Sequence, residues 1–142
     1  MHRILQPADW KPPRGYSNGV EAHGRQVFVA GQIGWNAAAE LVSDDLVAQT
    51  AQALRNVVAI VAEAGGRPEH IVRLTWYVTS RDAYVAAAKP IGAVYREIMG
   101  RHFPAMSAVE VTALVEKGAK VEIEATAVIP DGHAAGGPAA ID

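Results

Sequence analysis

Two glutamates near the end of the chain stand where they could take part in acid–base chemistry. Glu122 and Glu124 alternate with apolar residues in the segment 120–129, so a strand would place both carboxylates on one face, together with Thr126. Like charges at this spacing repel unless one of them is solvated, paired or protonated. The pattern fits a solvent-facing edge strand, or a carboxylate that meets a ligand and a neighbouring subunit. Spacing alone favours the solvent-facing edge.

The five histidines show no metal-binding pattern. None of them shares a helical face with a second histidine or a carboxylate at ligand spacing; they are His2, His23, His70, His102 and His133. We expect His70 to be solvated or to cap a turn, and His102 to have a packing role. The sequence also contains no Gly-x-Ser-x-Gly elbow and no nucleotide-binding glycine loop. We therefore expect no metal ion and no cofactor.

The composition restricts the function classes further. Of 142 residues, 13 are Lys or Arg and 15 are Asp or Glu, which gives a net charge of −2. Without a basic excess the chain has little means of neutralising phosphates, which argues against a nucleic-acid partner. The absence of cysteine excludes a disulfide framework, a thiolate zinc site and a cysteine nucleophile. Because we find neither a signal-like amino terminus nor an apolar run of membrane-spanning length, we expect a cytoplasmic protein without a membrane partner.

The elements that would position these residues follow the order ββαβαββ. The first two strands flank a glycine turn, which predicts a hairpin, and Ser43-Asp44-Asp45 caps a helix that ends at Gly65-Gly66. Pro90 would disturb the second helix. The expected strands are 20–22, 26–33, 71–79, 105–113 and 120–129, and the expected helices are about 45–64 and about 83–99.

This order predicts an α+β domain over residues 1–130. We expect one mixed sheet with two helices on a single face, parallel strands where a helix connects them, and a hairpin of the last two strands. The other face of the sheet needs cover, and self-association is the simplest cover. The tail, 131–142, is rich in Gly, Ala and Pro and is expected to be disordered.

Several short motifs, in order, resemble the RidA/YjgF family from about residue 16 to 129. They are Ala30-Gly31-Gln32-Ile33, the helix 49–65, the strand 71–78, Phe103-Pro104-Ala105, Val109-Glu110-Val111 and the strand 121–128. The resemblance implies a chorismate-mutase-like fold and a homotrimer with small-molecule clefts between its subunits. It also implies hydrolysis of reactive enamines and imines, formed by pyridoxal-phosphate enzymes, to a keto acid and ammonia.

The resemblance also implies roles for single residues. Tyr16 matches a cleft tyrosine, Gly31 a strand-end glycine that offers backbone groups, and Glu122 a glutamate thought to position water. The arginine that holds the substrate carboxylate after Phe-Pro-Ala is replaced by Met106, and a frequent cysteine by Ala108. A thioether has no donor and no charge, so a carboxylate buried beside it would lack a partner. Met106 therefore argues against the standard 2-imino acid substrate.

Two hypotheses keep the small-molecule cleft. In the first, the protein hydrolyses a more apolar or aromatic imine that lies near Met106, Trp35 or Trp76, although Trp76 is also typical of a core residue. Glu122 would orient water in this reaction, and Tyr16 would hydrogen-bond a substrate nitrogen or oxygen. In the second, hydrolysis is lost and the trimer binds or scavenges a small molecule.

Two further points stay open. An asparagine often found on the second helix in the family is replaced near Gly92, and Arg14, just before Gly15-Tyr16, is the best-placed cation to hold a carboxylate. Some family members have been described as endoribonucleases or translation inhibitors, so an RNA-directed activity is a third hypothesis. The acidic charge balance disfavours it.

Overall fold

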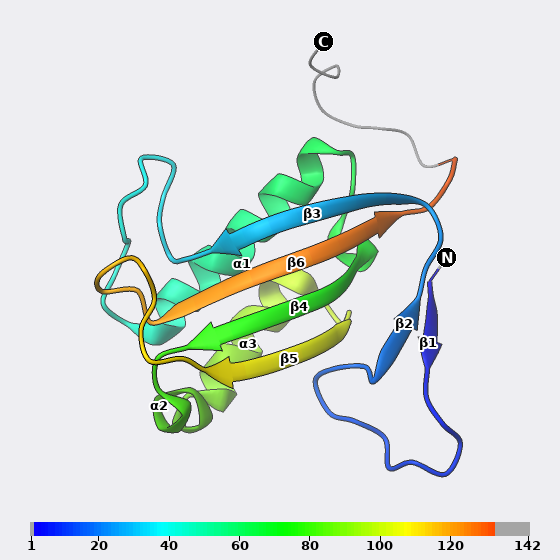
Figure 1. Cartoon of the computed structure of the whole chain (residues 1–142), viewed down its shortest axis with the longest axis horizontal. Coiled ribbons are helices and arrows are strands. Elements are labelled where there is room, and N and C mark those ends of the chain that lie inside the picture. Colours follow the sequence, from blue (N-terminus) through cyan, green and yellow to red (C-terminus); the bar gives the residue numbers. More distant parts are fainter. Residues whose placement is uncertain (1, 133–142) are drawn as a thin grey trace.

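The computed structural model describes residues 2–132. It contains a four-stranded mixed sheet, helices on one face of that sheet, and a small two-stranded arm at the amino terminus (Figure 1). The strands of the main sheet are β3 (Arg25–Gln32), β4 (Ile71–Val78), β5 (Ala105–Glu110) and β6 (Val121–Ile129). The other elements are β1 (Arg3–Leu5), β2 (Gly19–Glu21), α1 (Leu46–Glu63), the 3-10 helix η1 (Pro68–His70), α2 (Arg81–Ala86) and α3 (Ala88–Met99).

The strand order of the main sheet is β3-β6-β4-β5, with β6 antiparallel to both of its neighbours and β5 parallel to β4. The predicted α+β class and the parallel connections through helices are confirmed. The predicted hairpin of the last two strands is wrong, because β4 lies between β5 and β6. Every second residue of β6 is buried, and its carboxyl end is buried throughout. A strand with so many buried residues is stabilised most by a central position in the sheet, with a neighbouring strand on each side.

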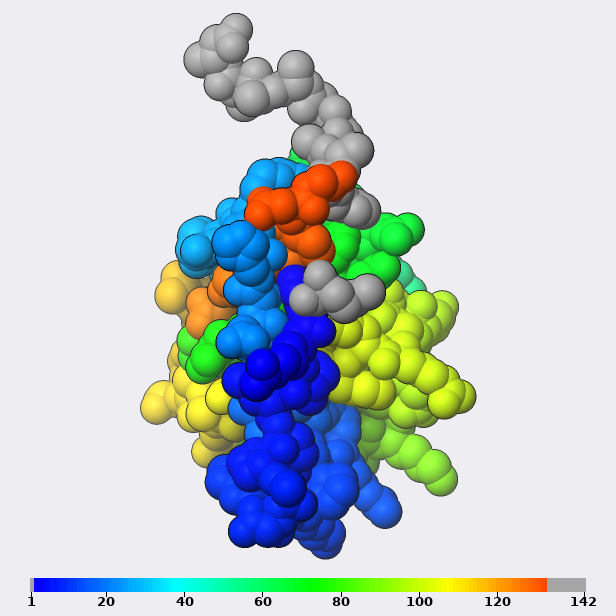
Figure 2. All heavy atoms as spheres, turned by 90° about the vertical axis from the view of Figure 1, so that its right-hand side faces the viewer, coloured from blue at the N-terminus to red at the C-terminus, as the bar shows by residue number. Residues whose placement is uncertain are grey.

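The predicted hairpin at residues 20–33 is also wrong, because β2 pairs with β1 while β3 pairs with β6. Gly24 has φ of +148° and runs so close to the end of β6 that a Cβ there would collide with the Ile129 carbonyl. The glycine therefore lets the chain pass tightly over β6 into the main sheet instead of folding back on β2. In Figure 2 the blue amino-terminal segment lies between the yellow-green residues of α3 and the strands.

The first predicted helix is confirmed as α1. The side chain of Asp45 accepts a hydrogen bond from the Ala48 N–H at 2.9 Å, and Gly65 follows the helix with φ of +80°. The second predicted helix is split at Ala87 into α2 and α3. Pro90 falls in the first turn of α3, where its missing N–H breaks no helical hydrogen bond.

The hydrophobic core fills the space between the helices and one face of the sheet. Leu54 and Val57 of α1 are fully buried there, as are Leu74 of β4 and Ile123 of β6. The opposite face, which we call the open face, carries no helix from the part of the chain that the structure describes (Figure 1). Phe28 lies on it and is 73% exposed. The open face is where a second protein surface would gain most from contact.

Glu122 and Glu124 share the open face, as their spacing predicts, but they do not lie on an edge strand, because β6 is flanked by β3 and β4. The Tyr77 hydroxyl donates a hydrogen bond to Glu124 at 2.6 Å. This bond, with burial and the charge of both glutamates, raises the pKa of Tyr77. Glu124 is thus held by a neutral phenol on the neighbouring strand.

None of the helices within residues 2–132 is long and apolar enough to cross a membrane. The predicted disordered tail, 131–142, falls outside the described residues apart from Asp131 and Gly132. The Asp131 carboxylate lies 3.0 Å from His23 Nε2.

Candidate functional site

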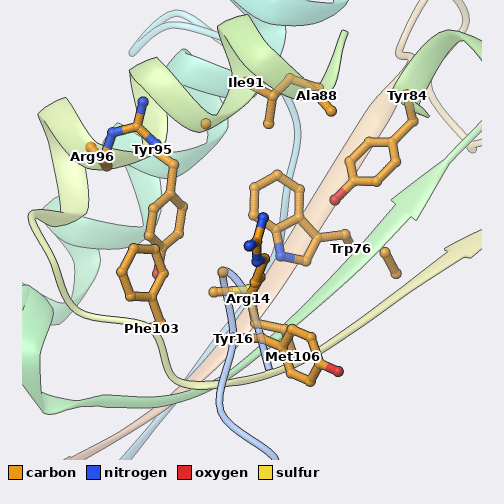
Figure 3. A pocket seen from close by; sticks show the side chains of 13 residues that line it. Arg14, Tyr16, Trp76, Tyr84, Ala88, Ile91, Tyr95, Arg96, Phe103 and Met106 are labelled. Atoms are coloured by element: carbon orange, nitrogen blue, oxygen red, sulfur yellow. The ribbon is translucent and has the colours of Figure 1, made fainter. Parts of the chain in front are cut away.

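A cavity of about 500 Å³ lies between the two carboxyl-terminal helices, the strand pair β4–β5 and the loop before β2 (Figure 3). Most of its lining is apolar or aromatic, which is typical of small-molecule sites. The lining residues are Arg14, Gly15, Tyr16, Trp76, Tyr84, Ala88, Ile91, Gly92, Tyr95, Arg96, Phe103, Met106 and Ala108.

The strand register places the sheet side of the cavity. In the parallel pair β4–β5, Met106 lies opposite Leu74 and Ala108 opposite Trp76. Side chains two residues apart on a strand share a face, so Trp76, Met106 and Ala108 all point toward the helices. Met106 is half-buried and packs against the core.

The loop that carries Arg14 and Tyr16 is tied to the start of β5 by one residue. The backbone N–H of Ser17 donates to the Pro104 carbonyl at 3.0 Å, and its hydroxyl donates to the Phe103 carbonyl at 2.5 Å. Ser17 is buried, although the loop around it is exposed. These two hydrogen bonds hold Tyr16 beside Met106.

Aromatic rings form the walls of the cavity. The ring of Trp76 is 6.2 Å from that of Tyr84 and 6.4 Å from that of Tyr95, and Phe103 stacks on Tyr95 at 5.4 Å. The Tyr95 hydroxyl donates to the His102 carbonyl at 2.6 Å, which fixes its ring. Burial raises the pKa of Tyr84 and of Tyr95, so both phenols stay neutral at physiological pH.

Among the described residues, the only charged ones that line the cavity are two arginines. Arg14 and Arg96 are both exposed, and neither takes part in an ion pair within residues 2–132. No carboxylate within residues 2–132 lines the cavity. The rim of the cavity therefore favours an anionic group, while the inner surface favours an apolar one.

Three of the predicted site residues lie outside the cavity. Glu122 is on the open face, across the sheet from Met106, and its carboxylate fills the space where a Cβ of Gly31 would stand. Trp35 follows β3 in a loop, half-buried, where its backbone pairs with Leu41 and its carbonyl accepts from Asn56 at 2.9 Å. The structure thus brings together Arg14, Tyr16, Met106 and Ala108, and separately brings together Gly31 and Glu122.

Sequence reasoning missed the aromatic wall. Tyr84 and Tyr95 have helical spacing that is equally typical of a hydrophobic core, and Phe103 precedes a strand like an ordinary packing residue. Gly92 was a better indication of a cavity beside this helix. Glycine in the middle of a helix weakens the helix, so its presence there suggests a role other than helix formation.

Two of the described histidines have structural roles. His102 Nε2 lies 2.7 Å from the Ile71 carbonyl, which agrees with the predicted packing role. His70 Nδ1 accepts from the Arg67 N–H at 2.9 Å and so caps η1, as predicted. Within residues 2–132 no three His, Asp or Glu side chains gather as metal ligands.

Comparison with known proteins identifies the family. The model of the family described as Endoribonuclease L-PSP matches residues 8–129, and a RutC family protein of Haemophilus influenzae is 39% identical over 105 residues, covering 74% of this chain and 80% of that one. The chain belongs to the RidA/YjgF family. A second relative within RidA/YjgF, a 2-iminobutanoate/2-iminopropanoate deaminase of Salmonella typhimurium, is 38% identical over 116 residues, covering 80% of this chain and 86% of that protein.

Solved RidA/YjgF structures agree with the fold described above. A Rid family protein from Yersinia pestis superposes with a TM-score of 0.79 at 38% identity, covering 90% of this chain and 98% of that one. YjgF from Escherichia coli superposes with a TM-score of 0.63 at 34% identity, covering 89% and 98%. The mixed sheet with helices on one face is therefore the RidA/YjgF fold.

Proposed function

We propose that this protein hydrolyses imines or enamines at clefts formed between three copies of the chain. The observation that carries the proposal is the cavity in which Tyr16 lies beside Met106 and Ala108, the two positions after Phe103-Pro104-Ala105 that matter most in the family resemblance. A relative with the name of an imine deaminase supports the same reaction class.

The reaction needs few groups. Water adds to the carbon of the C=N bond, the C–N bond then breaks, and the products are a ketone or keto acid and ammonia. A carboxylate that accepts a proton from the water makes it a better nucleophile, and a phenol that hydrogen-bonds the substrate nitrogen or oxygen stabilises the developing charge. Glu122 and Tyr16 are the residues we assign to these two roles.

A neighbouring copy has to supply the carboxylate. Glu122 lies on the open face and Met106 on the helix face, so one copy cannot present both to one ligand. Association through the open face would cover Phe28, which is otherwise 73% exposed. A closed ring of copies satisfies both requirements, and a homotrimer is the ring that the family resemblance implies.

The substrate we propose is more apolar or aromatic than a short 2-imino acid. Met106 offers a flexible, polarizable thioether where an arginine would fix a carboxylate. Aromatic rings occupy the walls beside it, so burying apolar surface supplies most of the affinity.

The test is hydrolysis of imines generated in the assay by an amino-acid oxidase. Ammonia release is measured with and without the protein, for imines made from aliphatic and from aromatic amino acids. We expect faster release from the aromatic imines, and a loss of at least roughly tenfold in Glu122→Gln, the loss of a general base being worth about 10²–10⁴-fold. Binding of aromatic keto acids without any hydrolysis would favour the scavenging alternative, and salt-sensitive RNA binding the third hypothesis. The cytoplasmic location stays a prediction.

A further inference from the structure

The indole nitrogen of Trp76 is a buried hydrogen-bond donor without an acceptor. The residue is 3% exposed, and its Nε1 finds no partner within residues 2–132. Buried polar groups nearly always have a hydrogen-bond partner, so this orphan donor calls for a reason. In Figure 3 the nitrogen lies on the edge of the ring that faces Arg14 and Met106, both of which line the same cavity. The donor points toward the cavity, and a bound molecule that displaces the side chains covering it would supply the missing acceptor.

The cavity wall around this donor is aromatic. Tyr84 and Tyr95 flank Trp76 at ring distances of 6.2 and 6.4 Å. Small residues occupy the rest of the helix side, because Ala88 and Gly92 line the cavity and a Cβ at Gly92 would touch only the end of the Arg96 side chain. Aromatic pairs at such distances stabilise offset or edge-on arrangements of rings. An aryl group is therefore the occupant that the walls favour.

The charges set the orientation of that occupant. Arg14 and Arg96 are exposed at the rim, whereas Met106, half-buried, brings no charge to the inner surface. Beside Met106 a carboxylate would lose much of its hydration without gaining an ion pair. At the rim it stays hydrated and also lies near an arginine. The ligand thus places its anionic end outward and its ring inward, the reverse of an orientation with the carboxylate at position 106.

We infer that the cavity selects imino or oxo acids whose aryl side chain carries an oxygen, and that the Trp76 Nε1–H recognises this oxygen. The ring packs against the wall formed by Trp76, Tyr84 and Tyr95, and its hydroxyl or carbonyl oxygen accepts the hydrogen bond of Trp76. The carboxylate lies at the rim, where the two arginines are exposed. The inference rests on the proposed function for the imine group, but the binding it describes does not require catalysis.

The test compares two stable oxo acids by calorimetric titration. They are 3-(4-hydroxyphenyl)-2-oxopropanoate and 3-phenyl-2-oxopropanoate, which differ by the ring oxygen alone. We expect the hydroxylated probe to bind roughly tenfold more tightly, which corresponds to about 1.4 kcal/mol for one hydrogen bond. Trp76→Phe keeps an aromatic ring but removes the donor, so the two probes should then bind equally. Trp10→Phe is the matched control, since Trp10 is 56% exposed and outside the cavity lining, and it should keep the preference.

Because Trp76 packs in the core, a second measurement leaves it in place. In an ¹H–¹⁵N spectrum of the unmodified protein, the indole signal of Trp76 should move on adding the hydroxylated probe and less on adding the phenyl probe. Trp10→Phe and Trp35→Phe assign the other two indole signals. A preference that survives in Trp76→Phe, an unmoved Trp76 signal, or no binding of either probe would overturn the inference. Hydrolysis of aliphatic imines in that last case would leave the proposed function standing.

Discussion

The carboxylate of Glu122 fills the space beside the Cα of Gly31, so no side chain fits at position 31 unless the carboxylate moves. The contact joins β6 to β3 where the register of these two strands shifts, between Val29 and Gln32. A glycine at such an irregularity permits close approach of a neighbouring group. Gly31 and Glu122 thus form one unit on the open face, and a change at either residue should act through the carboxylate.

Gly31→Ala should lower turnover with little effect on stability. The added methyl group meets the flexible end of Glu122 and not backbone, so the carboxylate can turn away at small cost. We expect turnover to fall at least roughly tenfold, as for removal of a general base, while the melting temperature changes by no more than a few degrees. Steady-state kinetics of Gly31→Ala, Glu122→Gln and the double variant check this. Full additivity of the two losses would show that Gly31 does not act through Glu122.

Phe28→Asp should break the assembly and the activity together. A charge on the open face makes burial of that face unfavourable. Light scattering should give about three times the 15.0 kDa chain mass for the unmodified protein and the single-chain mass for the variant. Val85→Asp is the matched control, because Val85 is 59% exposed on α2, away from the open face. A Phe28→Asp monomer that keeps full activity would refute the assignment of Glu122 to a neighbouring copy.

Gly92→Ala should stabilise the protein. Gly92 lies inside α3 without a positive φ, and alanine favours a helix interior by about 0.8–1.0 kcal/mol over glycine. Its Cβ would lie 3.3 Å from Arg96 Nη1, the movable end of a side chain. Urea unfolding should therefore show a gain of roughly 0.5–1 kcal/mol. Gly100→Ala is the contrasting case, because its φ of +72° strains any side chain, and it should lose stability. If both substitutions changed the free energy of unfolding in the same direction, this reasoning would be contradicted.

Stability should fall as the pH rises above about 10. Burial raises the pKa of Tyr84 and Tyr95 above the unfolded value of 10.0, so above pH 10 the native state holds protons that the unfolded state has lost. Their contribution is complete below pH 10 and is lost as the pH rises through the folded pKa. Tyr95, which is buried, adds up to about 1.4 kcal/mol per pH unit to the slope, and Tyr84, which is only half-buried, adds less.

Urea unfolding at several alkaline pH values measures that slope. Tyr95→Phe should make it shallower by removing one titrating group. Phe103→Leu disturbs the same aromatic wall without removing a titrating group, so its slope should equal that of the unmodified protein. If the unfolding free energy of Tyr95→Phe fell with pH as steeply as that of the unmodified protein, Tyr95 would not contribute to the pH dependence.

The local parts of the fold were predictable from the sequence because they depend on nearby residues. Asp45 and Gly65 mark the ends of α1 through caps that act within a few residues. Strand pairing was not predictable in the same way. Alternation shows that β6 has two faces, but it does not tell which strands lie beside it, and both expected hairpins were wrong for this reason.

The candidate site was predictable only where a motif marks it. Met106 and Ala108 follow Phe103-Pro104-Ala105, and Tyr16 has its own match, so their meeting in one cavity could be expected. Tyr84 comes from a separate short helix, and no local pattern shows that its ring lies 6.2 Å from Trp76. Nor does a sequence show that the indole nitrogen of Trp76 lacks an acceptor, since that depends on every neighbour of the ring.

The ratio of kcat/KM values for an aromatic and a short imine, in the unmodified protein and in Met106→Arg, tests the central claim most directly. The unmodified protein should prefer the imine made from tyrosine over the imine made from alanine. Arginine at position 106 introduces a bidentate carboxylate anchor and fills the inner cavity, so the variant should shift the ratio at least roughly tenfold toward the short substrate, as one charge-assisted hydrogen bond of about 1.5–3 kcal/mol allows. A ratio that Met106→Arg leaves unchanged, or a preference of the unmodified protein for the short imine, would contradict the account.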